Sequence, residues 1–135
     1  MTAFSLTGLD HLVLRIVDRD RMIAFYRDVV GCTLDRDRPD LGLTHLRAGR
    51  SLIDLITVDG QLGREGGAPP GVEGRNMDHL CLGVRPFDEA AIRAHLARHG
   101  VVVTGAGQRY GAEGDGASIY FQDPEGNTVE LKAHP

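Results

Sequence analysis

The sequence of 135 residues is poor in several residue types, and each shortage argues against a class of protein. Its two cysteines are too few for a disulfide framework. It has no tryptophan and aromatic residues make up only 5% of the chain, so it is poorly supplied for a binding protein that stacks a large flat molecule. Acidic residues outnumber basic ones and leave a formal net charge of −4, so we expect no nucleic-acid partner. No apolar run approaches the roughly 18 residues of a membrane-spanning helix, so we expect no membrane partner either.

The start of the chain carries no recognisable targeting signal. Its opening, MTAFSLTGLDH, has no basic segment followed by an apolar core, unlike a secretory signal peptide. We therefore expect a cytoplasmic protein. Hydrophobic residues make up 41% of the chain and charged residues 25%, which is ordinary for a globular protein, and the length suits a single domain.

An internal repeat divides the chain into two halves. The segment DHLVLRIV begins at Asp10 and the segment DHLCLGVR begins at Asp78, about half the chain length further on. A motif repeated at this spacing indicates a duplicated structural unit. The segment DGQLGREGGAPPGVEGRN between the copies is rich in glycine and proline, and we expect it to be an exposed linker.

Both halves predict the same order of elements, a strand, a helix and three more strands. In the first half Asp18 should cap the helix and Gly31 should end it. Its expected strands are 9–17, 33–37, 43–48 and 51–58. In the second half Asp88 should cap the helix, Gly100 should end it, and a glycine-rich loop should follow residue 104. The expected strands there are 77–85, 101–104, 117–122 and 128–133.

This order predicts an α+β fold of two βαβββ modules with mixed sheets. The first module should cover about 7–59, the linker 60–75 and the second module about 76–133. Side chains alternate between the two faces of a strand. In the first strand the aliphatic residues share one face, which should pack on the helix, and His11 should point to the open face. The same count places His79 on the open face of the second module.

Each module also has a carboxylate in the middle of its last, apolar strand, Asp54 in the first and Glu130 in the second. Both should point to the open face, beside His11 and His79. A carboxylate in such a place is costly unless it is paired or binds a cation. Imidazole and carboxylate donors together suit iron(II), zinc, nickel or manganese. The alternative is that each group only makes a structural hydrogen bond or salt bridge; the four matched positions favour a metal.

Three segments of the chain resemble the vicinal oxygen chelate superfamily: LDHLVLRIVDRDRMIAFYRDVVG, MDHLCLGV and SIYFQDPEGNTVELK. This superfamily includes glyoxalase I, fosfomycin resistance proteins, methylmalonyl-CoA epimerase and extradiol dioxygenases. Within it the chain is most similar to small bacterial glyoxalase-like proteins. The resemblance covers nearly the whole chain apart from the linker. It implies a fold of paired βαβββ modules whose curved sheets surround a metal cleft, and a homodimer.

The resemblance also implies a set of metal ligands. His11, His79 and Glu130 match residues that hold one divalent metal ion, which would be nickel, zinc, iron(II) or manganese. Asp54 falls where glyoxalase I has a fourth ligand, a glutamate. Aspartate is one methylene shorter, so it would reach the metal through water or miss it. Glu130 or Asp54, if loosely bound, would serve as the catalytic base.

Six further residues are candidates for substrate binding: Arg15, His45, Arg109, Tyr110, Ser118 and Tyr120. The resemblance to glyoxalase I implies that Arg15 grips a substrate carboxylate; the alternative is a salt bridge at the rim. Tyr120 would donate a hydrogen bond or act as an acid, or simply form an apolar wall. Arg109 and Tyr110 lie in the glycine-rich loop, which would close over a substrate. The direction of His45 stays open, and it is a spare ligand or base.

The resemblance implies a metal-dependent enzyme, a lyase or isomerase that stabilises an enolate of a small molecule with vicinal oxygens. An iron-dependent extradiol dioxygenase is the second hypothesis. A metal-free binding protein, like the bleomycin resistance proteins, is the third. The presence of His11, His79 and Glu130, and the shortage of aromatic residues for stacking, count against the third. In a homodimer the site would combine His11 of one chain with Glu130 of another.

Overall fold

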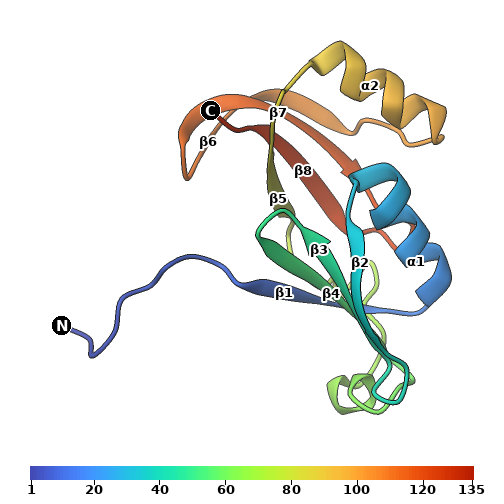
Figure 1. Cartoon of the computed structure of the whole chain (residues 1–135). Coiled ribbons are helices and arrows are strands. Elements are labelled where there is room, and N and C mark those ends of the chain that lie inside the picture. Colours follow the sequence, from blue (N-terminus) through green and yellow to red (C-terminus); the bar gives the residue numbers. More distant parts are fainter. The chain divides into compact units, whose positions relative to one another are not determined.

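The computed structural model describes residues 1–135, which form two compact units, Met1–Pro69 and Pro70–Pro135 (Figure 1). Each unit contains one four-stranded mixed sheet and one α-helix, in the order strand, helix and three strands. The predicted α+β fold of two βαβββ modules is therefore confirmed. The boundary between the units falls inside the segment expected to be a linker.

The first unit places its parallel strand pair at one edge of the sheet. Its elements are β1 (His11–Ile16), α1 (Arg19–Phe25) with a π-helical turn (Tyr26–Val30), β2 (Thr33–Arg38), β3 (Leu43–Ala48) and β4 (Ser51–Thr57). The strand order is β1-β4-β3-β2, where β1 runs parallel to β4 and the other pairs are antiparallel. All four strands agree with their expected positions to within two residues, and the largest difference is the start of β1, at His11 in place of residue 9.

The helical segment formed by α1 and the π-helical turn begins and ends where the sequence predicts. The side chain of Asp18 accepts a hydrogen bond from the backbone N–H of Arg21 at 3.1 Å, which satisfies one of the unpaired donors of the first turn. Gly31 ends the helical segment with φ of 93°, a left-handed conformation that glycine adopts without a steric penalty. Neither helix of the chain is long and apolar enough to cross a membrane.

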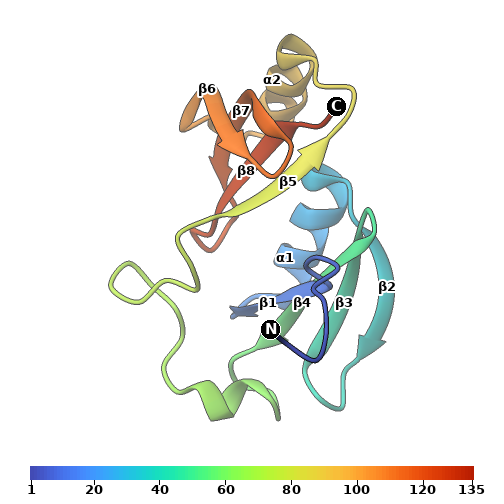
Figure 2. The ribbon, with the colours of Figure 1, turned by 90° about the vertical axis from the view of Figure 1, so that its left-hand side faces the viewer.

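The second unit repeats the topology of the first (Figure 2). Its elements are β5 (Leu80–Val84), α2 (Glu89–Arg98), β6 (Gly105–Gly111), β7 (Gly114–Gln122) and β8 (Thr128–Ala133). The strand order is β5-β8-β7-β6, and β5 runs parallel to β8. Asp88 caps α2 by accepting a hydrogen bond from the N–H of Ala91, in the same way as Asp18 caps α1. The sequence repeat is thus a repeat of structure.

Two predictions about the second unit are wrong. Residues 101–104 are not a strand, and the glycine-rich segment after them is not a loop but the hairpin of β6 and β7. The ladder runs from the pair Gly105 and Tyr120 to the pair Gly111 and Gly114. Glycine is depleted in strands because it adds no side chain to pack, so a glycine-rich segment does not show the side-chain pattern of a strand. Backbone hydrogen bonds nevertheless pair β6 with β7.

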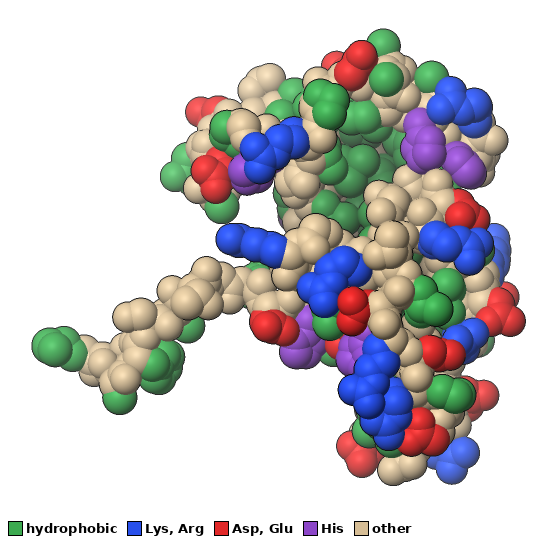
Figure 3. All heavy atoms as spheres, viewed as in Figure 1, with side chains coloured by type: hydrophobic (Ala, Val, Ile, Leu, Met, Phe, Trp, Pro, Cys, Tyr) green, Lys and Arg blue, Asp and Glu red, His purple; other side chains and the backbone are tan.

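The linker also has more structure than the composition predicts. A 3-10 turn covers Gly63–Gly66, and an isolated bridge joins Gly71 to Gly74. The first ten residues, in contrast, carry no helix or strand, and their apolar side chains lie in solvent; Leu6 is 89% exposed. Figure 3 shows hydrophobic side chains along this N-terminal segment.

The two faces of each sheet differ in burial, as the alternation predicts. The buried face is apolar, and its fully or almost fully buried side chains are Leu14, Ile16, Ile53 and Leu55 in the first unit and Ile119, Phe121, Val129 and Leu131 in the second. His11 in β1 and His79, which directly precedes β5, belong to the other face and are partly exposed. The open face of each sheet therefore carries the polar candidates.

Replacement of Leu14 by alanine tests the core assignment. Leu14 is fully buried, so Leu14→Ala should lower the free energy of unfolding by about 2–5 kcal/mol, because it removes buried methyl groups and leaves a cavity. The matched control Leu6→Ala, at an exposed position of the same unit, should change it by no more than about 0.5 kcal/mol. Urea unfolding followed by circular dichroism measures both. Equal effects of the two variants would contradict the assignment.

Candidate functional site

The open face of the first sheet brings three candidates together. In the strand register Asp54 of β4 lies between Val13 of β1 and His45 of β3. Residues in register point to the same face, so Asp54 and His45 are neighbours across two antiparallel strands. His11 lies two residues before Val13 and shares this face. The direction of His45, which the sequence left open, is therefore toward Asp54.

Asp54 lies between two imidazoles. Its Oδ1 is 2.7 Å from Nδ1 of His45, and its Oδ2 is 4.0 Å from Nε2 of His11. The Asp54 side chain is only 5% exposed, whereas that of His45 is 21% and that of His11 is 47% exposed. The buried carboxylate thus has a hydrogen-bond partner in His45, and its second oxygen points toward His11 beyond hydrogen-bonding distance.

The ring of His11 is oriented by the preceding residue. Its Nδ1 is 2.7 Å from Oδ1 of Asp10, which leaves Nε2 to face Asp54. The hydrogen bond to Asp10 and the negative charge of Asp54 raise the pKa of His11 above its ordinary value. A carboxylate that holds one ring nitrogen of a histidine is the arrangement found around metal-binding histidines, because it fixes the tautomer and the ring orientation.

The second sheet repeats this geometry with a closer contact. Nδ1 of His79 is 2.6 Å from Oδ1 of Asp78, and Nε2 of His79 is 3.1 Å from Oε2 of Glu130. In the register Glu130 of β8 lies between Cys81 of β5 and Tyr120 of β7, as Asp54 lies between Val13 and His45. Both Asp-His motifs therefore place an imidazole Nε2 beside a buried carboxylate.

Glu130 is held by a network of donors. The hydroxyl of Ser118 donates to Oε1 of Glu130 at 2.6 Å. Burial raises the pKa of Glu130, but hydrogen bonds from Ser118, Tyr120 and Cys81 and the neighbouring His79 outweigh it, so its pKa lies below the ordinary value. The carboxylate is therefore ionised at neutral pH. Burial and the charge of Glu130 in turn raise the pKa of Tyr120, which keeps its phenol protonated.

Two candidates from the glycine-rich segment separate in the structure. The guanidinium of Arg109 lies 5.4 Å from the centre of the Tyr120 ring, a distance typical of a cation–π contact. Arg109 pairs with Gly116 and shares the open face with Ser118 and Tyr120. Tyr110 follows Arg109 in the strand, points to the opposite face and is 83% exposed. The structure thus brings Arg109, and not Tyr110, to the group around Glu130.

Arg15 is engaged by the linker. Its guanidinium donates to the backbone carbonyls of Gly63 at 3.0 Å, Gly67 at 2.8 Å and Ala68 at 2.9 Å. A Cβ at Gly66 would lie within 3.0 Å of this guanidinium, so a side chain there would force Arg15 to shift. Arg15 shares a face with His11 and Asp54, but its charged end fastens the linker to the first unit.

Three residues close to the histidines and to Glu130 were not among the candidates. Asp10 and Asp78 orient the two histidines, and the signal for them was the repeated Asp-His pair itself. Lys132 is buried and donates to the carbonyl of Gly114 at 2.8 Å. It shares the face of Glu130 because it lies two residues further along β8, a position that strand alternation also marks.

The structure contains no group of three or more His, Cys, Asp and Glu side chains that would hold a metal ion. Each unit by itself offers a histidine–carboxylate pair.

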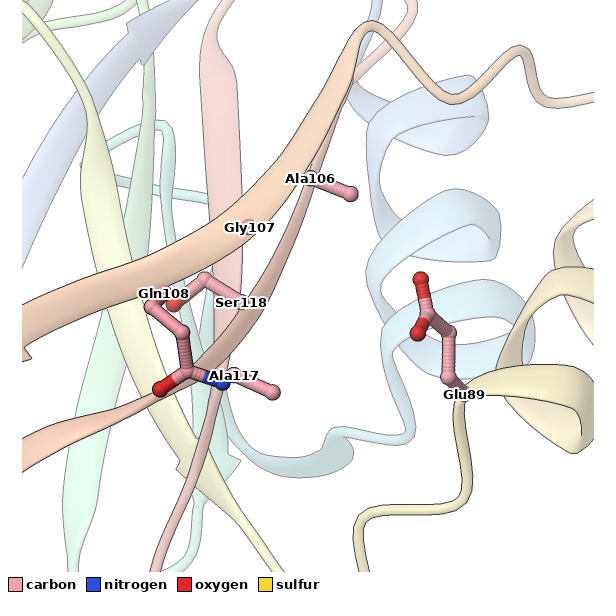
Figure 4. Close-up of a pocket in the computed structure, with 6 residues that line it drawn as sticks. All are labelled: Glu89, Ala106, Gly107, Gln108, Ala117 and Ser118. Carbon is pink, nitrogen blue, oxygen red and sulfur yellow. The ribbon is translucent and has the colours of Figure 1, made fainter.

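A separate pocket of about 290 Å³ lies in the second unit, beside the start of α2 (Figure 4). Its lining residues are Glu89, Ala106, Gly107, Gln108, Ala117 and Ser118. The side chains of Ala106, Gln108 and Ala117 point to the face opposite Glu130, so this pocket does not contain the His79–Glu130 pair.

The sequence matches a family model over nearly its whole length. Residues 8–131 match the model described as the glyoxalase/bleomycin resistance protein/dioxygenase superfamily. The chain is 32% identical over 131 residues to the glyoxalase domain-containing protein RDO1 of Mycosarcoma maydis, in an alignment that covers 96% of this chain and 70% of that protein. It is 28% identical over 131 residues to the virulence protein STM3117 of Salmonella typhimurium, with 93% and 83% covered.

Solved structures share the fold. The crystal structure of STM3117 matches with a TM-score of 0.81 and 24% identity, and the match covers 98% of this chain and all of that one. A mutant of the fosfomycin resistance protein FosX from Listeria monocytogenes, complexed with Mn(II) and 1S,2S-dihydroxypropylphosphonic acid, matches with a TM-score of 0.70 and 18% identity. That match covers 97% of this chain and 93% of the FosX chain.

Replacement of Asp10 tests the orientation of His11. Asp10→Asn should lower the pKa of His11, because it removes the carboxylate that accepts from Nδ1 and stabilises the imidazolium. An NMR titration of the His11 ring measures the pKa. The control Asp20→Asn removes an exposed carboxylate of the same unit that pairs with Arg19, and should leave the pKa of His11 unchanged. An unchanged pKa in Asp10→Asn would show that the contact is absent in solution.

Proposed function

The chain belongs to the glyoxalase/bleomycin resistance protein/dioxygenase superfamily, and from this we propose that it is a divalent-metal-dependent enzyme acting on a small molecule with vicinal oxygens. The proposed reaction is a lyase or isomerase reaction that moves a proton. The observation that carries the proposal is the pair of matched groups, each with an imidazole Nε2 directed at a buried carboxylate.

The donors of these groups fit a divalent metal. Asp10 and Asp78 occupy Nδ1 of His11 and His79, so the Nε2 atoms are the ligand atoms. Glu130 is buried and ionised, and Ser118 occupies its Oε1, which leaves Oε2 beside Nε2 of His79. Nitrogen and carboxylate donors of this kind suit manganese, iron(II), nickel or zinc.

We propose three protein ligands, His11, His79 and Glu130. Asp54 is the weakest candidate, because His45 already binds its Oδ1 and its Oδ2 lies 4.0 Å from Nε2 of His11. A site with three protein ligands keeps positions open for the paired oxygens of a substrate. Of these residues, His11 belongs to the first unit, and His79 and Glu130 belong to the second.

The other residues of the open faces have supporting roles in this proposal. A bound divalent ion supplies a Lewis acid that polarises the substrate oxygens. Tyr120, kept protonated by burial and by Glu130, donates a hydrogen bond to a substrate oxygen. Arg109, stacked on the Tyr120 ring, offers its charge to an anionic group of the substrate. Ser118 holds Glu130 in position.

FosX supports the choice of substrate class, since its structure holds Mn(II) together with a phosphonic acid that carries two adjacent hydroxyl groups. An extradiol-type iron dioxygenase is the second candidate, because two histidines and one carboxylate with open positions are also the ligand set of non-haem iron(II) oxygenases. A metal-free binding or bleomycin resistance protein is less well supported, since the open faces carry ionised donors and few aromatic rings.

Metal analysis and titration of the purified protein test the proposal. Wild type should bind one Mn(II), Ni(II), Zn(II) or Fe(II) per chain. Removal of any one ligand, in His11→Ala, His79→Ala or Glu130→Gln, should weaken metal binding more than about 100-fold. Loss of a residue that only hydrogen-bonds to a metal ligand already costs up to about 100-fold in affinity. The control His99→Ala, which removes a histidine at the end of α2, should bind like wild type.

The identity of the metal separates the two enzyme hypotheses, because iron favours the dioxygenase and manganese, nickel or zinc favour the lyase or isomerase. A folded wild-type protein that binds none of the four metals would refute the proposed function, and the metal-free binding protein would take its place.

A further inference from the structure

We propose that His45 and Asp54 form a proton-transfer dyad, in which Nε2 of His45 moves the proton and Asp54 positions His45 without binding the metal. This inference rests on the proposed function, because it assigns the acid–base group of that reaction. It also assigns Asp54 the role of positioning His45, in place of the fourth-ligand role that the resemblance to glyoxalase I implies.

The dyad is fixed by the backbone of the first sheet. His45 and Asp54 are direct partners in the register of the antiparallel strands β3 and β4. Their side chains meet with 2.7 Å between Nδ1 and Oδ1, and the Asp54 side chain is 5% exposed. A carboxylate only accepts hydrogen bonds, so Nδ1 of His45 is the donor in this contact, and in the neutral imidazole the lone pair lies on Nε2. His45 is 21% exposed, which leaves its ring accessible from the open face.

A comparison of the two units supports separate roles for the two carboxylates. Tyr120 is the cross-strand partner of Glu130, and His45 is the cross-strand partner of Asp54. Glu130 reaches to 3.1 Å of its histidine, His79, whereas the shorter Asp54 stays 4.0 Å from His11. The longer side chain of Glu130 therefore reaches Nε2 of His79, the proposed ligand atom of its unit. The shorter side chain of Asp54 binds His45 instead, an imidazole in whose place the second unit has Tyr120.

The position of the dyad suits a reaction beside His11. Oδ1 of Asp54 binds His45, and Oδ2 of the same carboxylate faces Nε2 of His11. The Asp54 carboxylate thus lies between His45 and Nε2 of His11, the proposed ligand atom of the same unit. A substrate whose paired oxygens lie next to His11 brings its adjacent C–H or O–H bond to the side of the sheet that carries His45.

The proton transfer balances without another reactant. Nε2 of His45 takes a proton from the C–H bond next to the paired oxygens, and the electrons of that bond move toward the polarised oxygen. The imidazolium keeps its Nδ1–H on Asp54, whose negative charge stabilises it. His45 then returns the proton to the former carbonyl carbon, while the hydroxyl proton passes from its own oxygen to the other oxygen of the pair. The product is an isomer, and His45 is neutral again.

Metal affinity separates a positioning role of Asp54 from a ligand role. Titration of Mn(II) into Asp54→Asn and His45→Gln should give the stoichiometry and affinity of wild type, whereas His11→Ala should lose the site. The control Asp35→Asn removes an exposed carboxylate of the same sheet and should also bind like wild type. A loss of affinity in Asp54→Asn as large as in His11→Ala would overturn the proposal, because Asp54 would then be a ligand.

Proton NMR of the metal-free protein tests the dyad independently of the proposed function. Wild type should show a downfield Nδ1–H resonance for His45, since a short bond to a carboxylate deshields this proton. The resonance should be lost in Asp54→Asn and His45→Gln and kept in Asp35→Asn. Its presence in a protein that binds no metal would refute the metal site alone, and its absence from wild type would refute the dyad.

Deuterium exchange into hydroxyacetone, whose hydroxyl and carbonyl oxygens are vicinal, tests the catalytic role. Wild type loaded with Mn(II) should accelerate exchange of the C–H between these groups, and His45→Gln should slow it by about 100- to 10,000-fold, the usual contribution of a general base. Added imidazole should restore part of the rate in His45→Ala, which a structural role would not allow. Undiminished exchange in His45→Gln, or none in metal-loaded wild type, would contradict the assignment of His45.

Discussion

A buried carboxylate in the middle of an apolar sheet is the constraint on which the rest of the open faces depends. Asp54 and Glu130 are almost completely buried, and an ionised carboxylate in such a place is costly without donors or a cation. Asp54 is hydrogen-bonded to His45, and Glu130 contacts Ser118 and His79. The polar groups of each face are therefore arranged around one charge, and the proposed metal is the partner that would complete them.

Duplication explains the symmetry of these groups, and divergence explains their differences. The register that aligns Val13, Asp54 and His45 aligns Cys81, Glu130 and Tyr120 in the second unit. The glutamate is one methylene longer and approaches its histidine, while the aspartate pairs with an imidazole. A repeated backbone has thus come to present two different sets of side chains, a ligand set and the proposed proton-transfer dyad.

The sequence predicted the fold well because its signals are local and repeated. Strand alternation placed His11, Asp54 and Glu130 on the open faces, and Asp18 and Gly31 marked the limits of the first helix. The hairpin of β6 and β7 escaped prediction, since its glycines carry no side-chain pattern and only backbone pairing holds it. The contact of Arg15 with the linker and that of His45 with Asp54 are tertiary, so alternation in a single strand had no means to reveal them.

The central claim is that one divalent metal binds to both histidines of the repeated motif and to a carboxylate. X-ray absorption spectroscopy of the Ni(II)-loaded protein tests it most directly, because imidazole rings give a characteristic scattering pattern beyond the first shell. The account predicts nitrogen and oxygen ligands only, with scattering from two imidazoles. A spectrum with sulfur from Cys81, or one without imidazole scattering, would contradict it.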